Sequence, residues 1–325
     1  MKLVTMRDGT RDGRLCIVSR DLSVMADAGH IAVTLQEAIE RWQEVEPLLL
    51  ALSEKVEAGA IDTVRAFDPE HAMAPLPRAW QWLDGSAFQS HGDLMSTVFG
   101  MEKLPFDERP LMYQGISDCF LGGREDVRFP SEQDGIDLEG EFGVIVDRVP
   151  MGTPAAEALG HVRLLVLIND WSLRAIAPIE MKTGFGWVQA KPACSVAPLA
   201  VTPDELGPHW RNGRIALNLD VAINGERFGT PNGEAMAFGF DQLIAHAART
   251  RDLVAGTVIG SGTVSNNNYR EVGSACITER RAIEMLDEGA ARTPFLHYGD
   301  RVRLEAHLPE GGSVFGAIDQ LVAQS

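Results

Sequence analysis

The 325-residue chain is predicted to have an α+β, β-rich fold, in which a small α+β amino-terminal domain precedes a larger body built on a mixed β-sheet. Its composition, 45% hydrophobic and 23% charged, is that of an ordinary globular protein. Strand patterns outnumber helical patterns in the second part of the chain. The regular alternation of strands and helices that marks a doubly wound fold is missing.

The amino-terminal domain is expected to span residues 1–72. A strand pattern at residues 14–18 is followed by apolar residues at helical spacing, which predict a helix over about residues 34–56. Three prolines near residue 75 then break the pattern, and prolines grouped in this way are typical of a domain boundary. The body is therefore expected to span residues 73–325.

The body is expected to consist mainly of strands. Runs of β-branched or alternating apolar residues predict strands at residues 141–146, 162–168, 215–221 and 302–307. Asn224-Gly225 is a typical pair for a tight hairpin turn. One helix, over about residues 240–249, is expected to interrupt the strands.

Charge and cysteine usage exclude several classes of protein. The chain has 29 Lys and Arg against 46 Asp and Glu, a net charge of −17, which repels nucleic acids and anionic membranes. The four cysteines lie far apart in the sequence, so neither a zinc site nor a disulfide framework is expected. The start of the chain is polar, and no apolar run is long enough to cross a bilayer. These features predict a cytoplasmic protein with no nucleic-acid or membrane partner.

Carboxylates stand where a strand should be apolar. Strand periodicity places Asp137, Glu139 and Glu141 on one face of the segment 135–146. Either this face is solvated, or it is buried and the repelling charges require a cation. All-oxygen ligands suit Mg²⁺, Ca²⁺ or Mn²⁺ better than zinc.

Two other carboxylates could complete such a site. Asp170 directly follows the apolar run 164–168, at the end of a predicted buried strand, although it could also cap a following turn. Asp84 and His91 are seven residues apart, which would place them on one face of a helix. The alternative for this pair is a capping Asp with an unrelated surface His.

Taken together, these segments resemble the fumarylacetoacetate hydrolase (fumarylacetoacetase) family, in its bacterial type. The matching residues are Asp84 with His91, Tyr113-Gln114-Gly115, Glu139-Gly140-Glu141, Asn169-Asp170-Trp171-Ser172-Leu173-Arg174, Lys191 and Gly262-Thr263-Val264-Ser265. They follow the family's order from about residue 75 to the carboxyl terminus. Each motif alone is common, but the ordered set is specific.

The resemblance implies a rolled mixed β-sheet body, usually a homodimer, that holds one divalent cation, with Mg²⁺ expected first and Ca²⁺ or Mn²⁺ as alternatives. The implied metal ligands are Asp84, Glu139, Glu141 and Asp170. The implied catalytic residues are His91, which would activate water, Glu279, which would orient that histidine, and the cations Arg174 and Lys191. The implied substrate-binding residues are Tyr113 and Thr263.

The function implied by the resemblance is a metal-dependent hydrolase that cleaves a C–C bond in a 1,3-dioxo acid, such as fumarylacetoacetate or an acylpyruvate. Such reactions belong to the catabolism of aromatic compounds, including tyrosine. The alternative is a decarboxylase, isomerase or hydratase acting on a related oxo-acid, and a third hypothesis is a metal-bound sensor without turnover. A water-activating pair of His91 and Glu279 favours the hydrolase, because protonating an enolate requires no such pair.

The chain departs from the mammalian-type pattern at the far end of the substrate pocket. Ser86 stands where that pattern has a tyrosine, Gly100 where it has an arginine, and Ala177 where it has a glutamine. The chemical centre is kept while these polar groups are lost. The identity of the substrate's distal group is therefore open.

Overall fold

The computed structural model describes residues 1–99 and 109–325. Within these residues the main feature is a 12-stranded mixed sheet, whose main path is β4-β3-β2-β1-β14-β11-β10-β19-β5-β6. Its end strands β4 and β6 do not pair with each other, so the described sheet stays open. The predicted α+β, β-rich fold with a large mixed sheet is confirmed.

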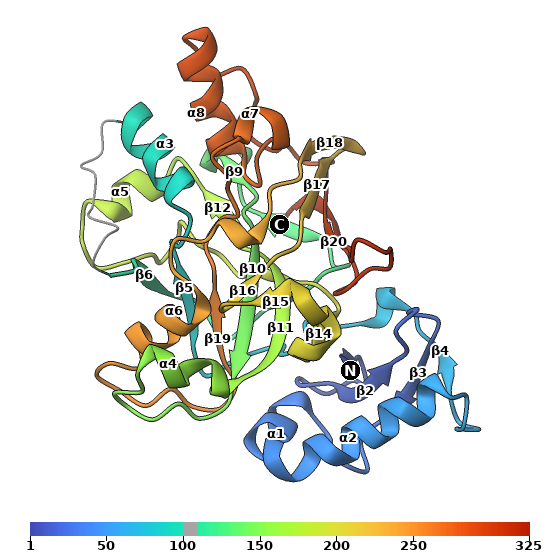
Figure 1. Ribbon diagram of the computed structural model, residues 1–325. Helices are drawn as coiled ribbons and strands as arrows, with labels where there is room; N and C mark the ends of the chain where they lie inside the picture. The colour runs from blue at the N-terminus through green and yellow to red at the C-terminus, as the bar shows by residue number, and fades with distance from the viewer. Residues whose placement is uncertain (100–108) are drawn as a thin grey trace.

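The amino-terminal residues form four antiparallel strands of this sheet, covered by two helices (Figure 1). The strands are β1 (Lys2–Met6), β2 (Arg14–Val18), β3 (Val24–Asp27) and β4 (Arg65–Ala66), and the helices are α1 (Leu35–Glu40) and α2 (Trp42–Glu57). The single helix expected over 34–56 is thus two helices. The backbone leaves the helical conformation at Arg41, whose guanidinium pairs with Glu37 and Glu44 on either side. Apolar spacing continues across this bend and could not reveal it.

The sheet does not end at residue 72. Strand β1 pairs with β14 (Leu199–Val201), with Leu3 opposite Ala200, so the amino-terminal strands and the body share one continuous sheet. Figure 1 shows the blue amino-terminal strands and helices beside β14 at one end of the molecule.

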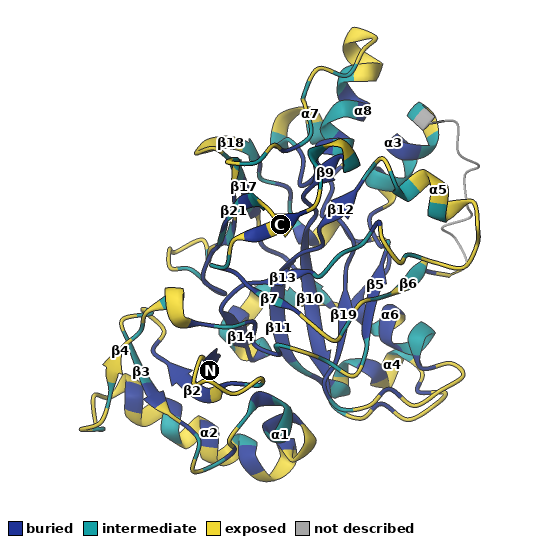
Figure 2. Cartoon of the chain, turned by 180° about the vertical axis from the view of Figure 1, so that it is seen from behind, coloured by how far each residue is buried: buried dark blue, intermediate teal, exposed yellow. Residues whose placement is uncertain are grey.

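Central strands of the body are buried on both faces. These are β5 (Trp82–Gly85), β10 (Gly140–Val146), β11 (Val162–Asn169) and β19 (Thr257–Gly260). Figure 2 shows them as a dark-blue core. Every residue of β10 is buried, because both faces of the sheet are covered by other apolar side chains. The strands expected at 141–146 and 162–168 are therefore confirmed.

A second, five-stranded sheet has the order β18-β17-β20-β21-β8. Its strands are β8 (Val127–Phe129), β17 (Leu219–Ile223), β18 (Glu226–Gly229), β20 (Arg301–Ala306) and β21 (Ile318–Gln324). Asn224 and Gly225 both have positive φ between β17 and β18, as a tight hairpin turn requires. The strand expected at 215–221 is divided into β16 (Arg214–Ile215) and β17.

Helices and short elements complete the described chain. The helices are α3 (Gln89–Phe99), α4 (Ala155–Ala158), α5 (Ala177–Met181), α6 (Phe240–Ala247), α7 (Tyr269–Val272) and α8 (Ile277–Glu288). The short strands are β6 (Met112–Gly115), β7 (Leu121–Gly122), β9 (Ile136–Asp137), β12 (Ser172–Leu173), β13 (Ser195–Val196) and β15 (Trp210–Arg211). Five 3₁₀ turns are also present among the described residues: Pro69–His71, Glu132–Asp134, Leu159–His161, Pro203–His209 and Gly233–Ala235. The helix expected over 240–249 is α6.

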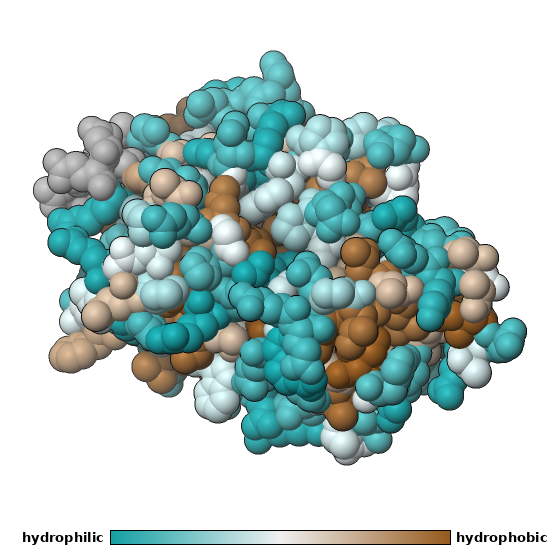
Figure 3. All heavy atoms as spheres, turned by 60° about the horizontal axis from the view of Figure 1, so that its bottom comes forward, coloured by the Kyte–Doolittle hydropathy of each residue, from teal (hydrophilic) through white to brown (hydrophobic). Residues whose placement is uncertain are grey.

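Hydrophilic side chains cover most of the face seen in Figure 3, with apolar side chains in patches between them. Among the described residues, none of the helices combines the length and the apolar composition that a membrane span requires.

Candidate active site

Three buried carboxylates converge at the centre of the large sheet. Asp84 is the second-last residue of β5, Glu141 lies in β10, and Asp170 directly follows β11. One oxygen from each lies within 4.8 Å of the others, and the three residues are at most 4% exposed. Strand β19 separates β10 from β5 in the sheet, so pairing between strands far apart in the sequence brings the carboxylates together.

Two glycines make room for this cluster. A Cβ atom at Gly260 would lie 2.5 Å from Asp84 Oδ1 and 2.8 Å from Glu141 Oε2. The backbone N–H of Gly262 donates to the same two oxygens, at 3.2 and 3.1 Å. Gly262 has φ of +77°, and a side chain there would meet the carbonyl oxygen of Gly85, so glycine is required on both counts. The Gly262-Thr263 motif therefore shapes the carboxylate cluster.

The electrostatics of the cluster fit a divalent cation. Burial and the neighbouring Asp170 raise the pKa of Asp84 to about 8, and burial and Asp84 raise the pKa of Glu141. Glu141 Oε1 is buried without a hydrogen-bond partner among the described residues. Like charges packed this closely are costly unless a cation compensates them, and hard oxygen ligands suit Mg²⁺, Mn²⁺ or Ca²⁺. Asp84, Glu141 and Asp170 would hold such an ion.

Glu139 lies outside this group of three. Its two carboxylate oxygens accept hydrogen bonds from Arg174 Nη2 and from Lys191 Nζ, the latter at 2.8 Å. Burial alone would raise the pKa of Glu139, but Lys191 and Arg174 outweigh it and lower the pKa. Lys191 Nζ also donates to Asp170 Oδ2 at 2.6 Å and thus joins Glu139 to the cluster. A role for Glu139 as a fourth metal ligand stays a prediction.

The expectation of one continuous strand over 135–146 is wrong. β9 ends at Asp137 and β10 begins at Gly140, because Glu139 leaves the ladder: its backbone bridges to Cys276, and its carbonyl oxygen accepts from Asp170 N at 2.9 Å. The carboxylates of Asp137 and Glu141 consequently contact different residues. The Asp137 carboxylate binds Arg174 and the start of α8.

A histidine–glutamate pair lies beside the carboxylates. His91, in the first turn of α3, is 2.9 Å from Glu279 through its Nδ1 atom and the Oε2 atom of the carboxylate. Glu279, in the first turn of α8, is fully buried, whereas the His91 side chain is 17% exposed. With Nδ1 held by the carboxylate, Nε2 is the ring atom available for proton transfer. His91 is also close enough to Glu139 to lower the pKa of that carboxyl group.

The idea that Asp84 and His91 share one helical face is wrong. Asp84 belongs to strand β5, and α3 begins only at Gln89. Asp84 pairs with Tyr113 on one side and Gly260 on the other, and this sheet pairing overrides the helical spacing. The two residues reach the site from a strand and from the helix that follows it.

Tyr113 and Thr263 lie at the same site. The Tyr113 hydroxyl donates to Asp170 Oδ2, and Lys191 Nζ is 5.5 Å from the centroid of the Tyr113 ring. Trp187 packs edge-on against Tyr113, with ring centroids 6.1 Å apart. Thr263 is buried and follows Gly262 directly.

Sequence reasoning assigned no role to two further residues at the site. The thiol of Cys194 lies 2.9 Å from Asp170 Oδ1, and burial raises the pKa of that thiol. Asn169 accepts from the backbone N–H of Glu139 at 2.9 Å through its side-chain oxygen. Asn169 lies inside the matched segment 169–174, which was the signal available, whereas nothing in the sequence distinguishes Cys194 from the other cysteines.

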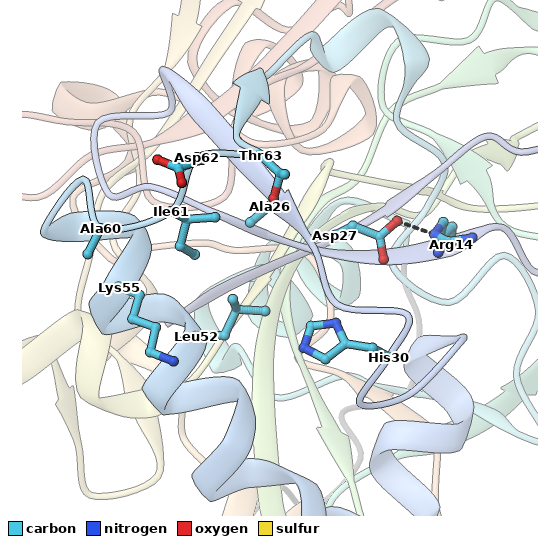
Figure 4. A pocket seen from close by; sticks show the side chains of 10 residues that line it. All are labelled: Arg14, Ala26, Asp27, His30, Leu52, Lys55, Ala60, Ile61, Asp62 and Thr63. Carbon is cyan, nitrogen blue, oxygen red and sulfur yellow. Dashed lines mark hydrogen bonds and ion pairs between the residues drawn. The ribbon is translucent and has the colours of Figure 1, made fainter.

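A pocket of about 650 Å³ lies elsewhere, between β3 and the end of α2 (Figure 4). Its lining comes entirely from the first 63 residues and includes His30, Lys55 and Asp62. Arg14 and Asp27, which also line it, form an ion pair with each other and are about half exposed. This shallow pocket lacks the buried, closely spaced carboxylates of the central site.

The raised pKa of Asp84 predicts how stability depends on pH. The folded metal-free chain keeps this proton up to about pH 8, whereas the unfolded chain loses it near pH 4, so its stability is expected to fall between these values. The rise in melting temperature on adding Mn²⁺ should therefore be larger at about pH 8 than at about pH 5.5. Thermal unfolding measures both. Metal-free Asp84→Asn, which has no proton to lose at this position, should lose less stability over the same pH range. An equal rise at both pH values in the wild type would contradict the prediction.

Comparisons with known proteins assign the chain to a family. A family model described as fumarylacetoacetate (FAA) hydrolase C-terminal matches residues 81–322, and one described as fumarylacetoacetase N-terminal domain 2 matches residues 1–78. The 2,4-didehydro-3-deoxy-L-rhamnonate hydrolase of Sphingomonas sp. (strain SKA58) is 30% identical over 163 residues, 49% of this chain and 54% of that protein. The human mitochondrial oxaloacetate tautomerase FAHD2B is 25% identical over 166 residues, 50% of each chain.

The chain thus spans about half the length of the curated relatives it matches. One similar crystal structure is maleylpyruvate hydrolase from Sphingobium sp. SYK-6 in complex with manganese(II) and pyruvate. The alignment with this structure covers 100% of both chains, with a TM-score of 0.66 and 17% sequence identity, which shows that the two proteins share a fold. Because the FAA hydrolase C-terminal model matches most of the chain, residues 81–322, the chain belongs to the fumarylacetoacetate hydrolase family.

Proposed function

We propose that this protein is a divalent-cation-dependent hydrolase that cleaves a C–C bond in a 1,3-dioxo acid, such as an acylpyruvate or fumarylacetoacetate. The observation that carries the proposal is the His91–Glu279 pair beside a buried carboxylate cluster. This pair can remove a proton from water, and the cluster can hold a cation.

The cation would act as a Lewis acid on the oxygens of the dioxo acid. The other parts of the site are supplied by the chain itself. Arg174 and Lys191 offer positive charge at partly buried positions, and Lys191 stays protonated because, despite burial, Asp170 and Glu139 raise its pKa. Tyr113 and Thr263 would donate hydrogen bonds to the carboxylate of the substrate.

Hydrolysis then follows from the placement of these groups. His91 Nε2 takes a proton from water, and the resulting hydroxide forms a bond to the acyl carbonyl carbon. Arg174 and Lys191 stabilise the charge on the oxyanion. The C–C bond then breaks, and its electron pair passes to the carbon of the leaving enolate. The imidazolium of His91 donates its proton to that enolate carbon. Glu279 keeps the imidazolium oriented throughout.

The similarity to maleylpyruvate hydrolase, whose structure contains manganese(II) and pyruvate, supports the proposed substrate class. The similarity to an oxaloacetate tautomerase supports the alternative, proton transfer to an enolate without attack by water. Incubating the protein with a panel of acylpyruvates, Mg²⁺ or Mn²⁺ and H₂¹⁸O separates the two. A hydrolase yields pyruvate and a carboxylic acid that contains ¹⁸O, an isomerase or tautomerase yields a product of unchanged formula, and a sensor yields none.

Other parts of the proposal stay predictions. Mg²⁺ is the expected physiological cation, with Mn²⁺ or Ca²⁺ as alternatives, because the three carboxylates provide only oxygen ligands. Homodimer formation and a place in aromatic-compound or tyrosine catabolism follow from the resemblance alone.

The distal end of the pocket predicts a relaxed specificity. Ser86 and Ala177 are half-buried and cannot supply the charge that would bind a distal carboxylate, and Gly100 lies outside the described residues. A buried charge-assisted hydrogen bond contributes about 1.5–3 kcal/mol, or one to two powers of ten in kcat/KM. Neutral-tailed acylpyruvates should therefore be cleaved within about 100-fold of fumarylacetoacetate.

The measurement is kcat/KM for fumarylacetoacetate and for a neutral-tailed analogue. Arg124, one cation that could replace the missing groups, is paired with Asp319 at 3.0 Å and with Glu70. A preference for the diacid of more than about a thousandfold would show that another cation binds the distal carboxylate.

A further inference from the structure

Asp137 is hydrogen-bonded to two parts of the proposed catalytic site. It lies in β9, opposite Ser172 of β12, and its side chain is fully buried. Asp137 takes no part in the proposed hydrolysis. Its carboxylate nevertheless contacts the helix that contains Glu279 and also the guanidinium of Arg174.

On one side, Asp137 holds the start of α8. Its Oδ1 accepts from Ile277 N at 2.7 Å, and its Oδ2 accepts from Thr278 N at 3.0 Å and from Thr278 Oγ1 at 2.7 Å. Backbone N–H groups in a first helical turn lack partners within the helix and carry partial positive charge. The cap residue itself, Cys276, offers only a sulfur to Glu279 N at 3.2 Å, a weak acceptor. The carboxylate is thus the strongest acceptor in this turn.

On the other side, Asp137 orients Arg174. The Nε atom of Arg174 donates to Asp137 Oδ2 at 2.8 Å, and its Nη2 atom donates to Glu139 Oε1. A planar guanidinium bound at both positions by carboxylates has a defined orientation. Because one carboxylate binds both Arg174 and the first turn of α8, which contains Glu279, a shift of Arg174 would also affect Glu279, and the reverse.

We propose that Asp137 is a positioning residue, which sets Glu279 and Arg174 at a fixed distance and orientation relative to each other. A neutral side chain could cap α8 on its own. The negative charge is needed because Oδ2, which already accepts from Thr278, must also bind the guanidinium of Arg174. The catalytic part of this inference rests on the proposed function.

The test compares Asp137→Asn with Asp68→Asn. Asparagine keeps the shape of aspartate, but its NH₂ group cannot accept from Arg174. Asp68 is a matched control, since its carboxylate also caps a helical turn, accepting from Glu70 N at 3.1 Å and contacting His71, but it is exposed and lies in the connection between β4 and β5. We expect Asp137→Asn to lower kcat by about 10- to 100-fold, with KM and Mn²⁺ affinity changed less than about threefold. Asp68→Asn should change none of them.

Hydrogen exchange provides a readout without substrate. The amides of Ile277 and Thr278, which donate to Asp137, should exchange about fivefold faster in Asp137→Asn than in the wild type, because one acceptor is lost. If wild type cleaves no dioxo acid, the proposed function fails, yet this measurement still shows whether Asp137 holds α8. A double variant with Glu279→Gln should lose less activity than the product of the single losses, because Asp137 acts partly through Glu279.

The inference would be overturned by unchanged exchange of the Ile277 and Thr278 amides, or by a kcat within about twofold of wild type in folded Asp137→Asn. If Asp137→Asn does not accumulate as folded protein, Asp137→Ser replaces it, since serine is a small neutral acceptor. The same outcomes then apply. A loss of activity in the Asp137→Asn, Glu279→Gln double variant equal to the product of the two single losses would also contradict the inference.

Discussion

Replacing Glu141 with glutamine is expected to weaken Mn²⁺ binding by at least about 100-fold and to abolish turnover, while raising the melting temperature of the metal-free protein. Both effects have one cause. Glu141 is buried with Asp84 and Asp170, and burial together with Asp84 raises its pKa. A neutral amide is a weaker ligand for a hard cation, but it removes the repulsion that the metal-free cluster must bear. Isothermal titration calorimetry and thermal unfolding measure the two effects.

The matched control is Asp147→Asn, near the other end of the same strand. Asp147 accepts from Arg163 Nε at 2.8 Å and contacts His161 Nδ1 at 2.7 Å, so the partners of this carboxylate are basic side chains rather than other carboxylates. This variant should leave the Mn²⁺ affinity unchanged and lower the melting temperature slightly. Asp84→Asn and Asp170→Asn should weaken Mn²⁺ binding as Glu141→Gln does, but Asp170→Asn should not raise the melting temperature, because Asp170 is also paired with Lys191. Glu139→Gln tests the predicted fourth ligand. Unchanged Mn²⁺ affinity in Glu141→Gln would rule out the proposed metal site.

Replacing His91 with alanine should lower kcat by roughly 10² to 10⁴, the usual loss when a general base is removed. Mn²⁺ affinity should change by less than about threefold, because His91 contacts Glu279 rather than the three clustered carboxylates. Glu279→Gln should give a smaller loss of kcat of the same kind, since the imidazole remains. Steady-state kinetics and calorimetry on the same protein preparations separate catalysis from metal binding.

His161→Ala is the control for this prediction. His161 also contacts a carboxylate through Nδ1, that of Asp147 at 2.7 Å. This contact lies at the end of strands β10 and β11 opposite to Glu141 and Asp170. It should leave kcat and Mn²⁺ affinity near the wild-type values. If His91→Ala lost only a few-fold in kcat, the histidine would be structural and water would have to be activated by another group.

Much of this site was predictable because its signals are local. Apolar runs identified the buried strands β10 and β11, and a carboxylate at a buried or strand-end position is unusual enough to indicate function. The ordered set of motifs from Asp84 to Ser265 indicated the family. Residue types and short spacings determine these features, so they can be read without knowing which strands pair.

Only the tertiary structure decided how those residues meet. The interruption at Glu139 depends on its bridge to Cys276, more than 100 residues later in the chain, and the strand position of Asp84 depends on pairing with β6 and β19. The continuity of β1 with β14 and the contacts of Asp137 with α8 are likewise invisible in any short window of sequence. Hydrogen bonds between distant segments determine these features, and local periodicity carries no information about which distant segment supplies the partner.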